Sequence, residues 1–234
     1  MVDFLTYSAA RADRRFELVI FDLDGVLIDS ELISASLILE MMRELGAEAD
    51  FLFVRRNFIG KSFGTVIAII EATFGLELPD DFEIRYLTRL ATKFERDLKP
   101  TEGILTVLEE MTCKTCIATS SKPERAQKSL EITDLAKFFP NLVFTASMVA
   151  RPKPAPDLFL YAAKTMNVGA DRTLVVEDSV AGLKAALAAG MTTARYVGGG
   201  HIRGLAPVRT APQGIDHTFE DWGDFRVHYP TVFQ

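Results

Sequence analysis

The stretch ELVIFDLDGVLIDS, residues 17–30, is the part of this sequence that decides the fold. A run of apolar residues ends at Asp22, and a second acid, Asp24, follows two residues later. A carboxylate at the end of a buried strand is costly unless it is paired, hydrogen-bonded or bound to a metal. Taken alone, the stretch is compatible with a turn, a calcium-binding loop or a catalytic site.

The two simplest interpretations of this stretch depend on its spacing. Asp-Gly is a common turn dipeptide, so Asp24 and Gly25 alone carry little weight. A calcium-binding EF-hand loop needs a glycine at its sixth position and a glutamate at its twelfth. Leu27 and Ile33 occupy those positions here, which excludes the calcium loop.

Short apolar runs recur along the chain and predict a buried parallel β-sheet. Each is rich in Val, Ile or Leu, as in strands that are covered on both faces. The runs lie at 17–22, 114–121, 172–179 and 192–197, and a last short strand and helix are expected within 217–225. Helical patterns at 123–132, 154–166 and 179–190 separate them. This alternation indicates an α/β fold with a doubly wound sheet, in which ligands collect beyond the carboxyl ends of the strands.

Residues 31–98 break this alternation. Helix-like apolar spacing without an intervening strand is found there in three segments, 30–46, 62–75 and 79–98. We therefore expect a small all-helical cap at 31–98, inserted after the first strand. The core is then formed by residues 16–30 together with 99–234, and residues 1–15 are an N-terminal extension.

Composition restricts the class of protein. Of the 234 residues, 48% are hydrophobic, so a sizeable core can form. The net charge of −6 argues against a nucleic-acid surface, which needs clustered Lys and Arg. The N-terminus lacks the order of a signal peptide, and no apolar run is long enough to span a bilayer. We expect a cytoplasmic monomer or weak homodimer that binds neither nucleic acid nor membranes.

Two cysteines, Cys113 and Cys116, form a CxxC pattern. Such a pattern fits a redox pair or half of a zinc site. A second pair to complete a zinc site is missing, and the chain has only three histidines. Cys113 precedes an apolar strand-like run and Cys116 lies within it, which favours two inert, partly buried thiols over a redox pair. Without a disulfide framework, a cytosolic compartment is the default.

Phosphoryl chemistry accounts for the two acids of the first stretch. An ionised carboxylate is a nucleophile that needs no base to activate it, and Asp22 suits this role. A second acid can protonate the leaving oxygen and later take a proton from water, and Asp24 suits this role. Mg²⁺ needs oxygen ligands, which Asp22, the backbone carbonyl of Asp24, Glu177 and Asp178 can supply. Glu177 and Asp178 also fit an acidic cluster at a helix N-terminus, and both interpretations can hold together.

Two further residues suit a phosphate group. Thr119 ends a predicted strand and can donate its hydroxyl to a phosphoryl oxygen, with a turn or cap role as the alternative. Lys153 lies between two prolines, which restrict its backbone. A charge that is already in position favours catalysis because it needs no reorganisation during the reaction. A plain proline-rich loop before a helix is the alternative for Lys153.

The order of these motifs closely resembles the haloacid dehalogenase-like hydrolase superfamily. FDLDGVLIDS resembles its first motif, IATSS its second, PKPAPD its third and VVEDSVAG its fourth. The resemblance covers nearly the whole chain from about residue 16. It implies a Rossmann-like core, Mg²⁺-dependent phosphoryl transfer through an aspartyl-phosphate, and a helical cap that closes over the site and selects the substrate. Pro152 is a departure, since Gly or Ser often precedes the lysine, but it leaves the role of the lysine intact.

The resemblance also indicates a subgroup. Asp24 argues for a phosphatase or phosphomutase, because the dehalogenases generally lack that acid. AAKTMNV, EDSVAGLKAALAAGM and FIGKSFGTV resemble the capped sugar-phosphate phosphatases, which include 6-phosphogluconate phosphatase. The alternative is a β-phosphoglucomutase, but those enzymes carry a histidine and an arginine where this chain has Ser34 and Phe63. A non-catalytic binding module, a further alternative, would be expected to lack some of the motif residues.

Candidates for contact with the substrate lie in the cap loop NFIGKSFGT, as Gly60, Lys61 and Ser62. Lys61 suits a second anionic group such as a carboxylate, and an ordinary lysine at a helix start is the alternative. Ser120 in the second motif is a further candidate. His201, after VGGG, is expected to be a flexible loop histidine. We therefore expect a Mg²⁺-dependent phosphatase whose partner is a small phosphate ester, a sugar phosphate.

Overall fold

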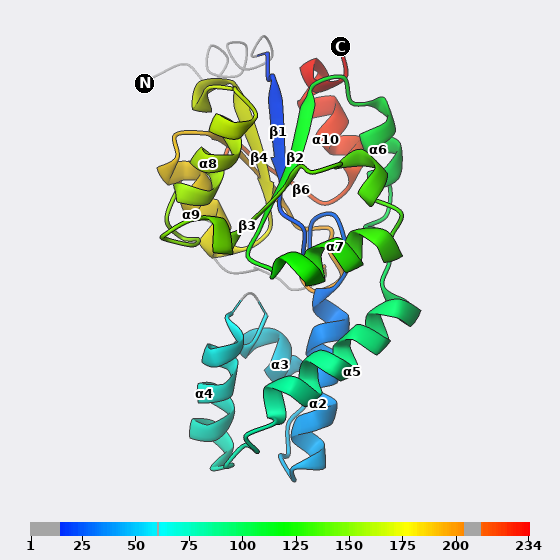
Figure 1. Cartoon of the computed structure of the whole chain (residues 1–234), viewed down its shortest axis with the longest axis vertical. Helices are drawn as coiled ribbons and strands as arrows, with labels where there is room; N and C mark the ends of the chain where they lie inside the picture. The colour runs from blue at the N-terminus through cyan, green and yellow to red at the C-terminus, as the bar shows by residue number, and fades with distance from the viewer. Residues whose placement is uncertain (1–14, 60, 204–211) are drawn as a thin grey trace.

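The computed structural model describes residues 15–59, 61–203 and 212–234. The expected N-terminal extension at 1–15, except Arg15, and the predicted substrate residue Gly60 lie outside the described residues. The described part of the chain forms a six-stranded sheet between helices. A separate group of helices lies beyond the carboxyl ends of the strands (Figure 1).

The sheet has the strand order β3-β2-β1-β4-β5-β6, and all of its pairs are parallel. Its strands are β1 (Leu18–Phe21), β2 (Lys114–Thr119), β3 (Val143–Thr145), β4 (Thr173–Glu177), β5 (Thr192–Tyr196) and β6 (His217–Phe219). The chain runs outward from β1 in both directions, which confirms the predicted doubly wound, Rossmann-like α/β fold. The sequence analysis missed β3, because three residues are too few to show a period.

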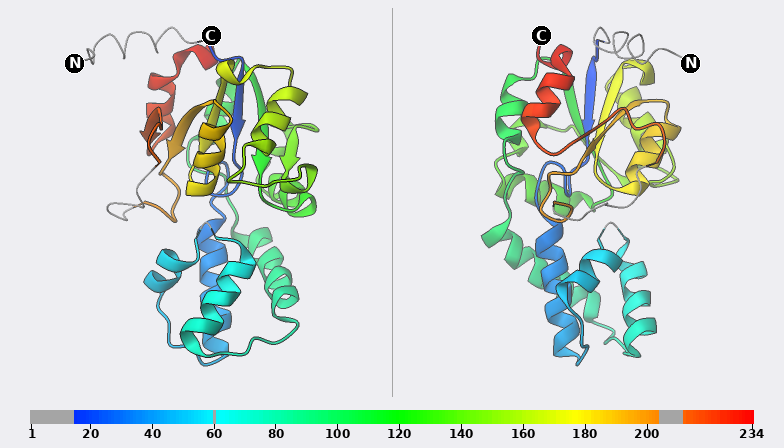
Figure 2. Two further views of the ribbon diagram at one scale, coloured as in Figure 1. Left: turned by 90° about the vertical axis from the view of Figure 1, so that its left-hand side faces the viewer. Right: turned by 180° about the vertical axis from the view of Figure 1, so that it is seen from behind.

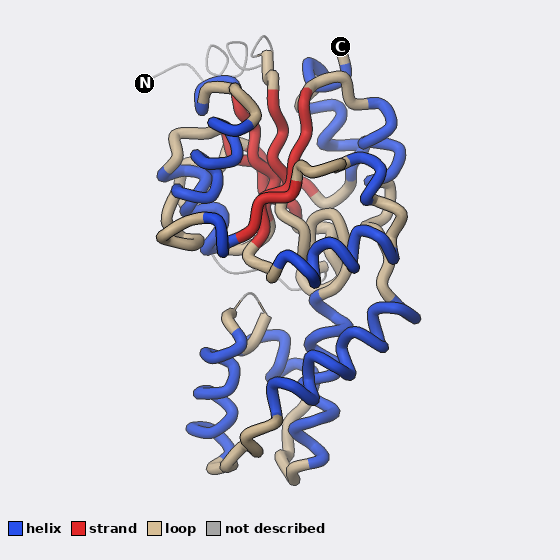
Figure 3. The backbone as a smooth tube through the Cα atoms, viewed as in Figure 1, coloured by secondary structure: helices blue, strands red, loops and turns tan. Residues whose placement is uncertain are grey.

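Both faces of the sheet are covered by helices (Figure 3). The core helices are α6 (Ile104–Glu110), α7 (Pro123–Ile132), α8 (Asp157–Thr165), α9 (Val180–Ala188) and α10 (Trp222–His228). Short 3₁₀ turns lie at η1 (Ala136–Phe138), η2 (Ala146–Met148), η3 (Ala170–Arg172) and η4 (Pro230–Phe233).

Alternate residues of β1 pack into two different clusters. Leu18 and Ile20 pack with α8 and α9, while Val19 and Phe21 pack with α6, α7 and α10. All four side chains are fully buried. Burial on both faces explains why β1 is continuously apolar in sequence rather than alternating.

Four helices form the group beyond the sheet: α2 (Glu31–Glu44), α3 (Phe51–Asn57), α4 (Phe63–Phe74) and α5 (Phe82–Asp97) (Figures 1 and 2). Three of them, α2, α4 and α5, lie in the segments where helices were expected. The helix α3 was not predicted, because its seven residues hold too few apolar repeats. We refer to residues 31–98 as the cap, in keeping with the boundaries expected from the sequence.

Two chain segments join the cap to the core, and they run side by side. The backbone N–H of Asp29 donates to the carbonyl of Lys99 at 3.0 Å, and the backbone N–H of Thr101 donates to the carbonyl of Leu27 at 3.0 Å. The hydroxyl of Thr101 also donates to the carbonyl of Val26 at 2.7 Å. The paired segments therefore set the cap opposite the carboxyl end of β1. Within the described residues, no helix combines the length and apolar character needed to cross a bilayer.

Candidate active site

Three acids that were predicted to act together meet at the carboxyl edge of the sheet. Asp22 directly follows β1, and Glu177 and Asp178 lie at the end of the neighbouring strand β4. One carboxylate oxygen from each lies within 4.8 Å of the other two, and all three residues are buried. The parallel register of β1 and β4 therefore assembles an acidic cluster.

Lys153 neutralises part of this cluster. Its Nζ donates to Asp22 Oδ1 at 2.8 Å, to Glu177 Oε1 at 2.8 Å and to the carbonyl of Ala118 at 2.9 Å. The side chain is only 4% exposed. Although burial opposes its charge, the carboxylates of Asp22 and Glu177 raise the pKa of Lys153, so it is a fixed cation. All three donor hydrogens of this ammonium group are thus in use.

The two acids of β4 differ in what their oxygens contact. The second oxygen of Glu177, Oε2, accepts a hydrogen bond from the backbone N–H of Ser179 at 2.7 Å. A Cβ at Gly182 would lie 1.6 Å from Glu177 Oε1, so the helix α9 can approach this carboxylate only with a glycine there. Both oxygens of Glu177 are therefore engaged by protein groups. In contrast, Oδ1 of Asp178 is buried and has no hydrogen-bond partner among the described residues.

These residues fit a divalent cation. Burial raises the pKa of Asp22 well above its ordinary value. Repulsion from Glu177 and Asp178 raises this pKa further, whereas the Lys153 ammonium lowers it. Burial and the neighbouring Glu177 likewise raise the pKa of Asp178. The cluster holds a buried carboxylate oxygen without a partner, and its acids carry more negative charge than one lysine can balance. Hard cations occupy sites of this type. Asp22 and Asp178 are the acids best placed to hold it, while Glu177 mainly holds Lys153.

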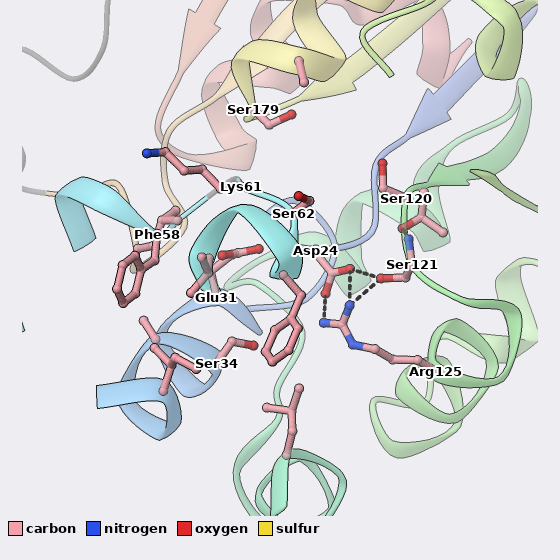
Figure 4. Close-up of a pocket in the computed structure, with 18 of the residues that line it drawn as sticks. Asp24, Glu31, Ser34, Phe58, Lys61, Ser62, Ser120, Ser121, Arg125 and Ser179 are labelled. Carbon is pink, nitrogen blue, oxygen red and sulfur yellow. Dashed lines mark hydrogen bonds and ion pairs between the residues drawn. The ribbon is translucent and has the colours of Figure 1, made fainter. Parts of the chain in front are cut away.

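Asp24 is engaged in a different way from the other acids. Its carboxylate accepts hydrogen bonds from the hydroxyls of Ser30 and Ser121, both at 2.5 Å. Arg125, from the first turn of α7, donates to it from Nη2 at 2.6 Å and from Nη1 at 3.2 Å (Figure 4). Burial would raise the pKa of Asp24, but Arg125 and the two serines together lower it below its ordinary value. Asp24 is thus an ionised carboxylate in a tight cluster of donors.

The sequence analysis identified none of the three residues that donate to Asp24. Ser30 had been placed at the start of a helix, and Ser121 follows the two residues that were chosen from the second motif. Arg125 lies in a helix with alternating charges, where an arginine ordinarily contacts water. Only the spacing of Ser121 and Arg125 could have indicated them. Arg125 lies four residues after Ser121, so the two side chains project from the same side at the start of the helix.

The second motif places its hydroxyls next to these acids. Thr119 is fully buried at the end of β2, and its Oγ1 accepts a hydrogen bond from the backbone N–H of Ser121 at 3.1 Å. Ser120 is exposed and lines the cavity described next. The structure therefore brings together Asp22, Asp24, Thr119, Ser120, Lys153, Glu177 and Asp178, all of which were selected from the sequence.

A cavity of about 530 Å³ opens from these residues toward the cap. Lys61 and Ser62 line it from the cap side. Lys61 is exposed, whereas Ser62 caps the helix α4 by accepting a hydrogen bond from the backbone N–H of Thr65 at 3.3 Å. Structural capping therefore accounts for the Ser62 hydroxyl. Lys61 lines the cavity, and its ammonium group points away from Asp24 (Figure 4).

Two positions that bear on the mutase alternative also line the cavity. Ser34 and Phe63 lie where a histidine and an arginine were expected for a β-phosphoglucomutase. The Phe63 ring stacks on that of Tyr86, with ring centres 4.9 Å apart. The wall of the cavity at this point is therefore aromatic rather than cationic.

Glu31, in the first turn of α2, is a lining residue that the sequence analysis did not select. Its pKa is raised to about 7, mainly by burial. Asp24 and Asp178 also raise this pKa, whereas His201 and Arg125 lower it. The cavity therefore contains a carboxyl group that gains or loses its charge near neutral pH.

The two cysteines are both free thiols, and neither lines the cavity. Burial raises the pKa of Cys113 to about 11 and shifts the pKa of Cys116 upward as well. Thiols that stay protonated at neutral pH are poor nucleophiles and poor redox groups. This arrangement agrees with the interpretation of Cys113 and Cys116 as inert residues.

Comparison with known proteins identifies the family. Residues 16–190 match the family model of the haloacid dehalogenase-like hydrolases. The chain belongs to this family, as the resemblance of its four motifs had predicted. Members of the family that are phosphatases use a divalent metal, which is in keeping with the buried acidic cluster.

Among the relatives, a 6-phosphogluconate phosphatase of Escherichia coli is 33% identical over 76% of this chain and 80% of its own. A phosphorylated carbohydrates phosphatase of Thermotoga maritima is 30% identical over 75% of this chain and 82% of its own. A haloacid dehalogenase-like protein of unknown function from Agrobacterium tumefaciens superimposes with a TM-score of 0.81 at 28% identity, over 94% of this chain and 100% of the other. Because the chain belongs to this hydrolase family and has these phosphatase relatives, it is a phosphoric monoester hydrolase.

Proposed function

We propose that this enzyme is a Mg²⁺-dependent phosphatase of a small sugar phosphate, with Asp22 as the nucleophile and Asp24 as the general acid and base. The observation that carries the proposal is the environment of Asp22. One of its oxygens is held by the Lys153 ammonium at 2.8 Å, and it lies against Asp178, whose Oδ1 has no partner within the described part of the chain.

The hydrogen bond from Lys153 supports Asp22 as the attacking group. It fixes the carboxylate through Oδ1 and leaves the other oxygen to attack phosphorus, which forms an aspartyl-phosphate. Lys153 also reduces the repulsion between this carboxylate and an incoming phosphate dianion. A divalent cation held by Asp22, Asp178 and the backbone carbonyl of Asp24 would add further positive charge where the phosphate binds.

The hydroxyl of Thr119 suits a phosphoryl oxygen. Because its Oγ1 accepts a hydrogen bond from the N–H of Ser121, its own hydrogen is free to be donated. Thr119 and Lys153 would then hold two different oxygens of the transferred group. Ser120, exposed at the same cavity wall, would contact the substrate next to them.

Asp24 is ionised in this structure and can therefore act directly as a base toward the water that hydrolyses the aspartyl-phosphate. To protonate the leaving oxygen, it must first bind a proton, which the contact with Arg125 opposes. We infer that Asp24 moves away from Arg125 during the first half of the reaction. Closure of the cap over the substrate would be the step that permits this movement.

The substrate class follows from the relatives and from the cavity. The E. coli and T. maritima relatives are named for phosphorylated sugar acids or carbohydrates. A cavity of about 530 Å³ suits a ligand of that size. Lys61 would contact a carboxylate at the far end of such a substrate. The aromatic wall at Phe63 and the short Ser34 favour a phosphatase over the mutase alternative.

The test is release of inorganic phosphate from a panel of sugar phosphates that includes 6-phosphogluconate, with and without Mg²⁺. We expect Mg²⁺-dependent release that is lost in Asp22→Asn. With β-glucose 1-phosphate, formation of glucose 6-phosphate without phosphate release would show the mutase instead. Turnover that needs no metal, or normal turnover of Asp22→Asn, would contradict the proposed mechanism.

A further inference from the structure

A single arginine of the cap binds a loop of the core through several bonds. Arg55, in α3, donates from Nη2 to the carbonyl oxygens of Gly200 at 3.3 Å, His201 at 3.0 Å and Arg203 at 3.1 Å. Its Nε also donates to the carbonyl of His201 at 3.3 Å. We call residues 198–203 the glycine loop. Three of its carbonyls thus converge on one guanidinium from the other part of the molecule.

The glycine loop carries a histidine that contacts the acidic cluster. His201 is 1% exposed, so the expectation of a flexible loop histidine was wrong. Its Nε2 lies 2.7 Å from Oδ2 of Asp178. A carboxylate that binds a cation is ionised and can only accept, so with a cation bound Nε2 carries the hydrogen of this bond. His201 therefore occupies one oxygen of Asp178 and leaves Oδ1 as the oxygen without a partner.

The imidazole of His201 is confined from both sides. A Cβ at Gly25 would lie 2.7 Å from its Cε1, and a Cβ at Gly199 would lie 2.7 Å from the same atom. Gly25 is also in the left-handed region, with a φ of 81°. The loop is also tied to the segment that joins the core to the cap, since the N–H of Gly200 donates to Asp29 Oδ1 at 3.2 Å. The ring can hold this position only while the glycine loop stays in place.

We propose that His201 and Arg55 are positioning residues of the metal site. His201 orients the carboxylate of Asp178, and Arg55 holds the loop that carries His201. This inference rests on the proposed function, in which Asp22 and Asp178 bind the cation. Groups that hydrogen-bond to a metal ligand set its orientation, and their loss typically weakens metal binding by about 10–100-fold.

The arrangement links the position of the cap to the metal site. Arg55 belongs to the cap, whereas His201 and Asp178 belong to the core, so displacement of α3 would break the bonds to the glycine loop. Because coupling between two binding events is reciprocal, a bound cation would in turn favour the docked cap. No residue of this chain of contacts needs to touch the substrate.

The test is a calorimetric titration of the full chain with Mg²⁺. We expect His201→Ala to weaken Mg²⁺ binding by about 10–100-fold, and His201→Gln, whose amide can still donate to Asp178, to restore most of it. Arg55→Met should weaken binding in the same direction, but less. Arg85→Met is the matched control, because Arg85 is a cap arginine that pairs with Glu44 inside the cap. The Mg²⁺ affinity of this variant should equal that of the wild type.

A double variant separates positioning from general damage. If Arg55 acts through His201, Arg55→Met will cost no further affinity in the His201→Ala background, whereas independent effects would add. Thermal unfolding of each variant shows that it is folded. Wild-type affinity in both single variants, or full additivity in the double variant, overturns the inference. Failure of the wild type itself to bind Mg²⁺, with Asp178→Asn no different, would instead refute the proposed metal site.

Discussion

Asp24 accepts a hydrogen bond from Nη2 of Arg125 at 2.6 Å, and the same guanidinium lies 5.3 Å from the ring centre of Phe94 in the cap. One side chain of the core helix α7 therefore contacts both the proposed general acid and the helix α5. Movement of the cap would change the environment of Arg125, and through it the environment of Asp24. This relationship gives a physical basis for coupling between cap closure and proton transfer.

Replacement of Arg125 by Met is expected to raise the pKa of Asp24. The guanidinium is the main group that lowers this pKa against the effect of burial. Because kcat/KM covers the steps up to the aspartyl-phosphate, in which Asp24 must carry a proton, the basic limb of its pH profile should move to higher pH. Lys128→Met removes a cation of the same helix that pairs with Glu95 of α5 and not with Asp24, so it should leave the profile unchanged. An unaltered basic limb in Arg125→Met would show that Asp24 does not determine it.

Replacement of Lys153 by Met should affect both activity and stability. Loss of the ammonium leaves Asp22 and Glu177 buried without a counter-charge, and such a loss typically costs about 3–5 kcal/mol. We expect the free energy of unfolding, measured in urea without divalent cations, to fall by about that amount, and phosphate release to disappear. Added Mg²⁺ should recover part of the stability. A variant as stable as the wild type would contradict the assignment of Lys153 as the fixed cation.

Glu31 predicts a particular dependence of stability on pH. Its folded pKa, raised by burial to about 7, exceeds its ordinary value of 4.5, so the folded protein binds more protons than the unfolded chain between these values. The contribution of Glu31 is fully present below pH 4.5 and is lost as the pH rises through 7. Without divalent cations, Glu31→Gln should therefore lose less stability than the wild type over this interval.

Chemical denaturation of both proteins at several pH values measures this difference. The charged groups that act on Glu31 are His201, Arg125, Asp24 and Asp178, and all four are retained in the variant. Parallel stability curves for the two proteins would show that Glu31 does not titrate in this range.

The cysteines are expected to react slowly and to be dispensable. Cys116 is fully buried and Cys113 has a pKa of about 11, so a thiol reagent at neutral pH should modify Cys116 only on unfolding. Cys113→Ser should release phosphate at the wild-type rate, with or without a reductant. Loss of activity in this variant, or a reductant-dependent rate, would favour the redox interpretation of the CxxC pattern.

The strand ends could be predicted from the sequence because they depend on local patterns. An apolar run that stops at Asp22, or at Glu177 and Asp178, marks a buried strand and its carboxyl end at once. In a parallel sheet, such ends meet at the same edge, so the separate motifs could be placed together. The identity of the acids and of Lys153 therefore followed from order and chemistry.

The partners of these acids could not be predicted in this way. Arg125 and Asp24 are separated by 101 residues, and Arg55 and His201 by 146. Neither arginine stands in a pattern that differs from an ordinary surface helix. His201 follows three glycines, which usually indicate a mobile loop, and its burial depends on contacts with Gly25 and with the cap. The contacts of Arg55 arise only once the cap is folded against the core, and those of Arg125 only once α7 is packed beside β1.

The central claim is that Asp22 becomes phosphorylated during turnover. The most direct measurement is a rapid acid quench of the enzyme with a substrate labelled in its phosphate group, followed by digestion and identification of the labelled peptide. We predict that the label appears within the first turnover on the peptide that contains Asp22, and that Asp22→Asn acquires none. Phosphate release at the full rate with no label on that peptide would contradict the account.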